Sequence, residues 1–190
     1  MLLRPASFFA AAGGRASYAG PIIYSLACHA IAVLFAGAYD LTFASIAGTL
    51  DSISVAQTRG AAGGLLWILW LLALTPLYVL VVLFAGAAVY QLLVRLVVGK
   101  ANAGYGATLR VSAYLSAVGL IAWMPVLGAL IGPWGVWINA SGLRRFHSTT
   151  TPRAILIAAI PYAFSIIWVA SGQSTFWEFL LGGGTMFPTS

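Results

Sequence analysis

The sequence predicts an all-α, polytopic membrane protein with five transmembrane helices, a cytoplasmic N-terminus and a C-terminus outside. First, 62% of the residues are hydrophobic and only 6% are charged, and the mean hydropathy is +0.99. Soluble domains carry about 25% charged residues. Second, long runs of sequence contain no charge at all. Third, the basic residues lie between these runs, so the net charge of +6 indicates topology signals and no nucleic-acid partner is expected.

Residues 1–18 are predicted to form a cytoplasmic lead-in before the first span. They do not have the pattern of a signal peptide, because the apolar part is short and Arg15 follows it. We expect an amphipathic or irregular segment in which Phe8 and Phe9 rest on the membrane surface.

The first predicted span covers residues 19–39 and ends near Asp40. The polar stretch that follows, "GTLDSISVAQTRGAAGG", is predicted to be a loop. The next uncharged run, residues 61–94, is too long for one helix perpendicular to the membrane. Because Pro76 lies inside it, we expect a kinked or tilted second span.

The third uncharged run, residues 111–143, has 33 residues. As one helix it would be about 50 Å long, whereas a hydrocarbon core is about 30 Å thick. Its middle, "WMPVLGALIGPWG", is rich in helix-breaking proline and glycine. Since basic residues flank both ends, the run is predicted to be a hairpin that forms spans three and four. The turn is placed at 124–128, or alternatively at 132–133.

The last span is predicted at 154–172, and 173–190 form an outer-side tail with a short interfacial segment at 176–181. The predicted membrane domain is therefore 19–172. With the N-terminus inside, Arg59 and the three acids lie outside. Eight of the nine basic residues then lie inside, namely Arg4, Arg15, Arg95, Lys100, Arg110, Arg144, Arg145 and Arg153. This distribution follows the positive-inside rule.

Four segments together resemble the Yip1-domain family: "RPASFF", "GKANAGYGATLRVSAY", "MPVLGALIGPWGVW" and "GLRRFHSTTTPRAILIAAIPY". The resemblance covers nearly the whole chain and implies five membrane helices with a cytosolic N-terminus. Eukaryotic members are similar to trafficking factors that bind small GTPases. This chain lacks their long N-terminal region and their Asp-Leu-Tyr-Gly-Pro stretch. The resemblance is therefore to a short, bacterial-type member, and GTPase binding is not carried over.

The sequence predicts no enzyme, and no catalytic, cofactor-binding or metal-binding residues. It contains only three carboxylates, far apart along the chain. No paired acids, phosphate-binding loop or nucleophile motif occurs. Cys28 and His29 would supply at most two metal ligands, which is too few.

Polar and small residues inside the predicted spans are candidates for helix packing or for an intramembrane role. His29 is either a functional ionisable group or a neutral imidazole bonded to a neighbouring Ser, Tyr or backbone group. Asn139 either bonds across helices or lines a polar path. Gly128 and Gly132 have the spacing that lets helices approach closely, or else belong to a turn.

The inner loop between spans four and five carries a predicted exposed cationic cluster of Arg144, Arg145, His147 and Arg153. The cluster either serves topology alone or contacts anionic lipid headgroups or an acidic partner surface. Nearby positive charge is expected to lower the pKa of His147.

Together these features predict a scaffold or accessory subunit that binds membrane lipids, other membrane proteins or a multi-subunit complex. The alternative is a small lipid or solute transporter that works at the proline-kinked helices. Arginine outnumbers lysine eight to one, a bias typical of GC-rich bacterial genomes, so the bacterial cytoplasmic (inner) membrane is the expected location.

Overall fold

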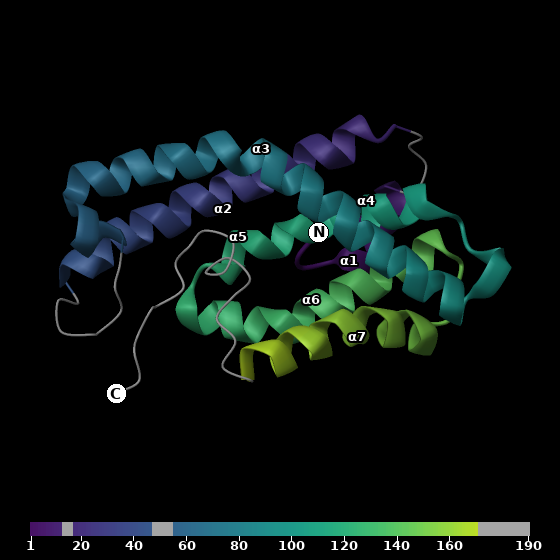
Figure 1. Ribbon diagram of the computed structural model, residues 1–190. Helices are drawn as coiled ribbons and strands as arrows, with labels where there is room; N and C mark the ends of the chain where they lie inside the picture. Colours follow the sequence, from purple (N-terminus) through teal and green to yellow (C-terminus); the bar gives the residue numbers. More distant parts are fainter. Residues whose placement is uncertain (13–16, 47–54, 171–190) are drawn as a thin grey trace.

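The computed structural model describes residues 1–12, 17–46 and 55–170, and these form helices without any strand (Figure 1). The elements are α1 (Pro5–Ala12), α2 (Ala19–Ile46), α3 (Val55–Val97), η1 (Gly99–Ala101), α4 (Tyr105–Leu115), η2 (Ser116–Val118), α5 (Gly119–Ala122), α6 (Pro125–Phe146) and α7 (Thr151–Ala170).

The helices form two long pairs with shorter helices between them. Helix α2 packs along α3, and α6 packs along α7 (Figure 1). Helices α4 and α5 lie between the pairs, because both contact α2 on one side and α6 on the other. The predicted all-α class is therefore confirmed.

The first two long helices extend beyond their predicted ends. Helix α2 continues past Tyr39 to Ile46, and α3 already begins at Val55. The prediction of a loop was therefore wrong for residues 55–64, which are helical. No proline occurs before Pro76 in α3, so nothing in the backbone stops the helix from continuing towards its N-terminus.

Helix α3 has 43 residues and contains Pro76 in its interior. At 1.5 Å per residue it is about 64 Å long, twice the thickness of a hydrocarbon core. Figure 1 shows that it bends partway along its length. Proline removes one backbone N–H and crowds the preceding turn, which accounts for a bend in an otherwise continuous helix.

The run at 111–143 is folded back on itself. Helices α4 and α5 form one leg and α6 forms the other, with the turn at 123–124, where Met124 has an extended backbone and Pro125 begins α6. This turn lies at the edge of the first predicted position, whereas the alternative position at 132–133 lies inside α6. At the open end of the hairpin, Thr108 Oγ1 lies 3.0 Å from His147 Nε2. Both flanks of the run therefore meet at one end of the molecule.

The largest buried cluster lies toward this open end. It joins α3, α4, α6 and α7 through Val94, Val111, Ala140, Leu143, Ala154, Ile157 and Ala158. Several of these residues are small, so the helices approach closely. The open end of the hairpin is thus a packed part of the structure.

Many large apolar side chains face outwards. By length and mean hydropathy, two helical segments in the described part of the chain qualify to cross a membrane, Ala19–Tyr39 at 1.8 and Gly63–Val97 at 2.5. Helix α7 contains a shorter apolar segment, Thr151–Ile167. Exposed fractions reach 73% at Leu96 of α3 and 67% at Ile167 of α7. Apolar surface of this extent is expected where the surroundings are lipid.

Helix α1 packs against α6. Phe9 is fully buried, with its ring centroid 6.1 Å from that of Phe146. A Cβ atom on Gly142 would lie 2.9 Å from Phe9 Cζ, so the glycine leaves the space that the ring fills. The prediction that Phe9 rests on the membrane surface was therefore wrong. Trp134 Nε1 also donates a 2.8 Å hydrogen bond to the Leu2 carbonyl.

Candidate functional site

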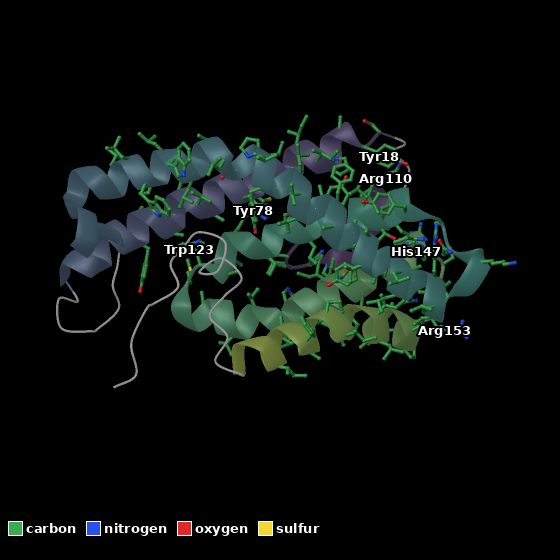
Figure 2. All side chains as sticks on the ribbon, viewed as in Figure 1. Tyr18, Tyr78, Arg110, Trp123, His147 and Arg153 are labelled. Carbon is green, nitrogen blue, oxygen red and sulfur yellow. The ribbon has the colours of Figure 1, made fainter. Side chains whose placement is uncertain are left out.

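Exposed arginines gather where α6 ends and α7 begins. Arg144 and Arg145 occupy the last turn of α6, where positive charge interacts favourably with the helix dipole. Arg153 is exposed in the first turn of α7, where the dipole disfavours a cation. Figure 2 shows Arg110, His147 and Arg153 toward the same end of the molecule, away from Trp123. Helix stability alone does not explain the position of Arg153.

The connection between α6 and α7 is a tight turn. Ser148 has a φ of 49°, and the Thr149 N–H donates to the Arg144 carbonyl over 3.2 Å. A left-handed residue followed by this bond is the Schellman arrangement, which satisfies carbonyls at a helix end. It keeps the arginines of α6 next to the start of α7.

A groove runs between α1 and the end of α6, with a volume of about 460 Å³. Its polar side is lined by Arg144, Arg145, Ser148 and Thr149, and its apolar side includes Trp137. No Asp or Glu occurs between Asp51 and Glu178, so no acid from that stretch neutralises the arginines. The groove combines positive charge, hydroxyl groups and apolar surface, which suits an anionic amphiphile.

His147 does not belong to this exposed surface. Its side chain is 2% exposed, whereas we expected an exposed cluster, and on this point the prediction was wrong. The physical reason is a buried set of polar partners. Nε2 lies 3.0 Å from Thr108 Oγ1, and Nδ1 accepts a 3.2 Å hydrogen bond from the Ala103 N–H.

The direction of these bonds determines the protonation state of the ring. Because Nδ1 accepts from a backbone N–H, the neutral ring carries its proton on Nε2 and donates to Thr108. Thr108 in turn donates to Gln91 Oε1 over 2.5 Å. Burial lowers the pKa of His147, which favours this neutral form. The predicted direction of the pKa shift holds, with burial as its main cause.

The same network fixes the turn between α3 and α4. Gln91 Nε2 donates to Asn102 Oδ1 over 2.9 Å, and Asn102 Nδ2 donates to the Gly99 carbonyl over 2.6 Å. Gly99 and Gly104 have φ values of +78° and +84°, which side chains other than glycine rarely adopt. Three helices and one turn therefore depend on one chain of hydrogen bonds, which we call the Gln91–His147 network (Gln91, Asn102, Thr108 and His147).

Arg110 lies beside the N-terminal part of α2. Its guanidinium carbon is 4.8 Å from the centre of the Tyr18 ring, a cation–π contact. A Cβ atom on Gly106 would collide with the Tyr18 hydroxyl, so this glycine leaves room for the ring. Figure 2 shows Tyr18 and Arg110 side by side.

His29 contacts two helices. Nδ1 lies 2.9 Å from the Ser25 carbonyl of the same helix, and the ring packs edge-on against Tyr78 of α3 at 6.0 Å. A carbonyl only accepts, so Nδ1 carries the proton in this contact. The bond to a backbone group agrees with the structural alternative for His29, although its role stays a prediction.

Asn139 and Gly132 lie on the side of α6 that faces α7. Asn139 is 2% exposed, next to Tyr90 of α3. A Cβ atom on Gly132 would collide with the Tyr162 ring of α7, so close helix approach requires the glycine. Gly128 also belongs to α6, but its surroundings lie outside the described part of the structure.

Within residues 1–12, 17–46 and 55–170, the structure brings together no constellation typical of catalysis. Among the side chains it describes, no group of three His, Cys, Asp or Glu residues could hold a metal ion. The predicted interfacial segment at 176–181 lies outside the described residues.

An all-helical chain with apolar outer surfaces and arginines gathered at one end is a membrane protein in its class. The family model of the Yip1 domain matches residues 1–172, and the chain belongs to this family, as its sequence motifs indicated. No curated protein and no solved structure matches the chain.

Sequence reasoning missed the partners of His147. Gln91 and Thr108 are buried polar residues within or beside apolar runs. Gln91 lies in the uncharged run of the second predicted span, and a polar residue there signals an interhelical hydrogen bond. That signal could have identified one partner, but not the pairing with a residue on α6.

Proposed function

We propose that this protein is a non-enzymatic, five-span protein of the bacterial cytoplasmic membrane that organises lipids or protein partners. It does so through its basic end, which is the end of the molecule where Arg110, Arg144, Arg145 and Arg153 lie. In this arrangement the spans are α2, α3, the leg formed by α4 and α5, α6 and α7. The basic end faces the cytoplasm.

One observation carries the proposal: the ends of the hairpin meet at Thr108 and His147, and the arginines lie at the same end. Residues that follow the positive-inside rule would then share the cytoplasmic side. The cytoplasmic surface of a membrane is negative, and each nearby Arg or Lys contributes about 1 kcal/mol to attraction. This supports recognition of an anionic headgroup or an acidic protein surface.

The groove supports a specific site rather than a diffuse field. Arg144 and Arg145 belong to the last turn of α6. The turn that follows places the hydroxyl groups of Ser148 and Thr149 in the same groove. Arginine binds phosphate or carboxylate with two parallel hydrogen bonds, which gives specificity in addition to attraction.

The test replaces Arg144 and Arg145 with glutamine and compares the variant with Lys100→Gln, which removes another exposed cation outside the groove. The purified proteins are mixed with phosphatidylglycerol and phosphatidylethanolamine in detergent, and retained lipid is counted by native mass spectrometry. We expect the wild type and Lys100→Gln to prefer the anionic lipid. The double variant should lose the preference.

If headgroup preference is unchanged in the double variant, the groove does not bind anionic lipids. The same experiment on complexes extracted with mild detergent tests the protein-partner form of the proposal. A transporter would instead move solute or lipid across reconstituted vesicles, and replacement of Asn139 would abolish that flux while the protein still assembled.

A further inference from the structure

A second cavity, partly open to the surroundings, lies between the helices and away from the groove that Arg144 and Arg145 line. It has a volume of about 270 Å³ and is bounded by α3, α4, η2, α6 and α7. Its polar lining residues are Tyr90, Asn139, Tyr162 and Ser165, and the others include Leu115, Val118 and Val136. No basic or acidic residue lines it, so it is not built for an ion.

The amide of Asn139 is not satisfied by the described protein. The side chain is 2% exposed, and Nδ2 has no partner among the described residues that meets the geometry of a hydrogen bond, although the Tyr90 hydroxyl lies close to the amide. Buried polar groups are almost always hydrogen-bonded, and hydrocarbon offers no water to replace a missing partner. An NH₂ group has two hydrogens to donate, so a contact with Tyr90 still leaves one hydrogen of Asn139 without an acceptor beside the cavity that this residue lines.

The depth of Asn139 indicates what kind of acceptor can reach it. Asn139 lies five positions before Arg144 on α6, about 7.5 Å along the helix axis. The interfacial layer on each side of a bilayer is about 5–8 Å thick. If Arg144 lies at headgroup level, Asn139 lies at the depth where the ester groups of phospholipids join their acyl chains.

The cavity extends from this level toward the middle of the molecule. Gly132 also lines it, seven positions from Asn139 and therefore about 10 Å further along α6. Across from Gly132 stands Tyr162, three residues before Ser165 on α7. Ser165 Oγ already donates to the Tyr162 carbonyl over 2.7 Å. The unsatisfied donor is thus at the end nearer the headgroups, and the deeper part is mainly apolar.

We propose that this cavity holds one acyl chain of a membrane phospholipid, whose ester carbonyl accepts a hydrogen bond from Asn139 Nδ2. A carbonyl oxygen only accepts, which matches a donor that lacks a partner. The chain beyond the ester fits the apolar lining. The inference rests on the proposed placement of Arg144 at headgroup level, but it does not depend on which headgroup Arg144 and Arg145 bind, so the two tests can fail separately.

The test compares two phospholipids with the same headgroup and chain length, one ester-linked and one ether-linked. The ether lacks the carbonyl. The purified protein is exchanged into an equal mixture, and the retained lipids are measured by native mass spectrometry. We expect the wild type to retain the ester lipid about three- to tenfold more than the ether lipid, since tenfold corresponds to about 1.4 kcal/mol.

In Asn139→Leu the ratio of retained ester lipid to retained ether lipid should fall to about one. The matched control is Thr75→Ala, which removes a buried polar group of α3 that bonds to its own helix and lines neither this cavity nor the groove of Arg144 and Arg145. Equal retention of both lipids by the wild type would overturn the proposal, as would an unchanged preference in Asn139→Leu. Retention of a second copy of the chain in place of lipid would also overturn it.

If Asn139→Leu does not fold, infrared spectroscopy on the wild type provides the second test. An ester lipid labelled with ¹³C at the carbonyl should show a band at lower frequency from a hydrogen-bonded carbonyl in the retained population. A retained lipid with only the band of free ester would contradict the proposal.

Discussion

Thr108 Oγ1 lies 3.0 Å from His147 Nε2, although 39 positions separate the two residues in the sequence. Thr108 belongs to the first leg of the helical hairpin, and His147 caps the second. The contact therefore closes the hairpin at its basic end. Because both side chains are buried, the hydrogen bond forms where water does not compete.

Thr108→Val should destabilise the protein. Valine has nearly the shape of threonine but cannot bond to Gln91 or His147, so two buried polar groups lose a partner. A buried group without its partner costs about 1–3 kcal/mol. The free energy of unfolding in detergent should fall by at least this amount, whereas Thr108→Ser should lose less. A valine variant as stable as the wild type would mean that the network contributes nothing.

Acid should weaken the fold through His147. Its pKa is lowered in the folded protein, while the unfolded side chain titrates near the ordinary value of about 6.5. Below that pH the unfolded chain binds a proton that the folded chain does not. Stability should therefore be complete above about pH 7 and fall as the pH drops through 6.5 toward the folded pKa.

The check is the unfolding temperature of the wild type and of His147→Gln between pH 7.5 and 5.5. Glutamine has no titrating proton, so its unfolding temperature should depend less on pH, even though it starts lower. If the unfolding temperature falls equally in both proteins between pH 7.5 and 5.5, a group other than His147 causes the effect.

Gly142→Ala should disturb the packing of α1. The added methyl would lie 2.7 Å from Val111 Cγ1 and 2.9 Å from Phe9 Cζ. Overpacking of this kind costs about 1–3 kcal/mol. We expect a lower unfolding temperature and faster proteolysis of the N-terminal segment. Gly86→Ala is the control, because nothing lies within 4 Å of its added Cβ atom.

A double variant separates the role of Phe9 from that of Val111. Phe9→Ala alone should cost about 3–5 kcal/mol, as is typical when a buried Phe is truncated. If Phe9 is the main obstacle, Gly142→Ala should cost less in the Phe9→Ala background than in the wild type. Full additivity would show that the two residues do not compete for the same space.

Gly132→Leu should separate α6 from α7. Its side chain would occupy the position of the Tyr162 ring, so either the helices move apart or the tyrosine leaves. We expect a loss of thermal stability that Tyr162→Ala partly restores. A Gly132→Leu variant that keeps the stability of the wild type would contradict the close approach of the two helices.

The sequence predicted the helical class and the hairpin because both depend on strong local signals. Runs without charge define apolar helices, and Pro125 after an extended Met124 breaks the third run where the leg must turn. The arginine distribution placed both flanks together by an independent argument. The predicted ends of the helices were less accurate, since residues 55–64 contain neither a proline nor a clear capping residue that would mark them as loop or helix.

The candidate site was predicted only in part, because burial depends on contacts between distant segments. His147 stands among arginines in the sequence, and this suggested an exposed position. Its partners come from α3, α4 and the turn between them, and no local pattern reports that pairing. From the sequence, Phe9 was likewise predicted to rest on the membrane surface. Its burial depends on the space that Gly142 leaves on α6, far away in the sequence.

The five-span arrangement requires the two ends of the hairpin to lie on the same side of the membrane. In a background with Cys28→Ala, single cysteines are placed at exposed positions Lys100, Arg145 and Ala122 and labelled in intact cells with a membrane-impermeant thiol reagent. In this arrangement Lys100→Cys and Arg145→Cys should be protected until the membrane is opened, whereas Ala122→Cys, beside the turn, should react from outside. Labelling of positions 100 and 145 from opposite sides would contradict it.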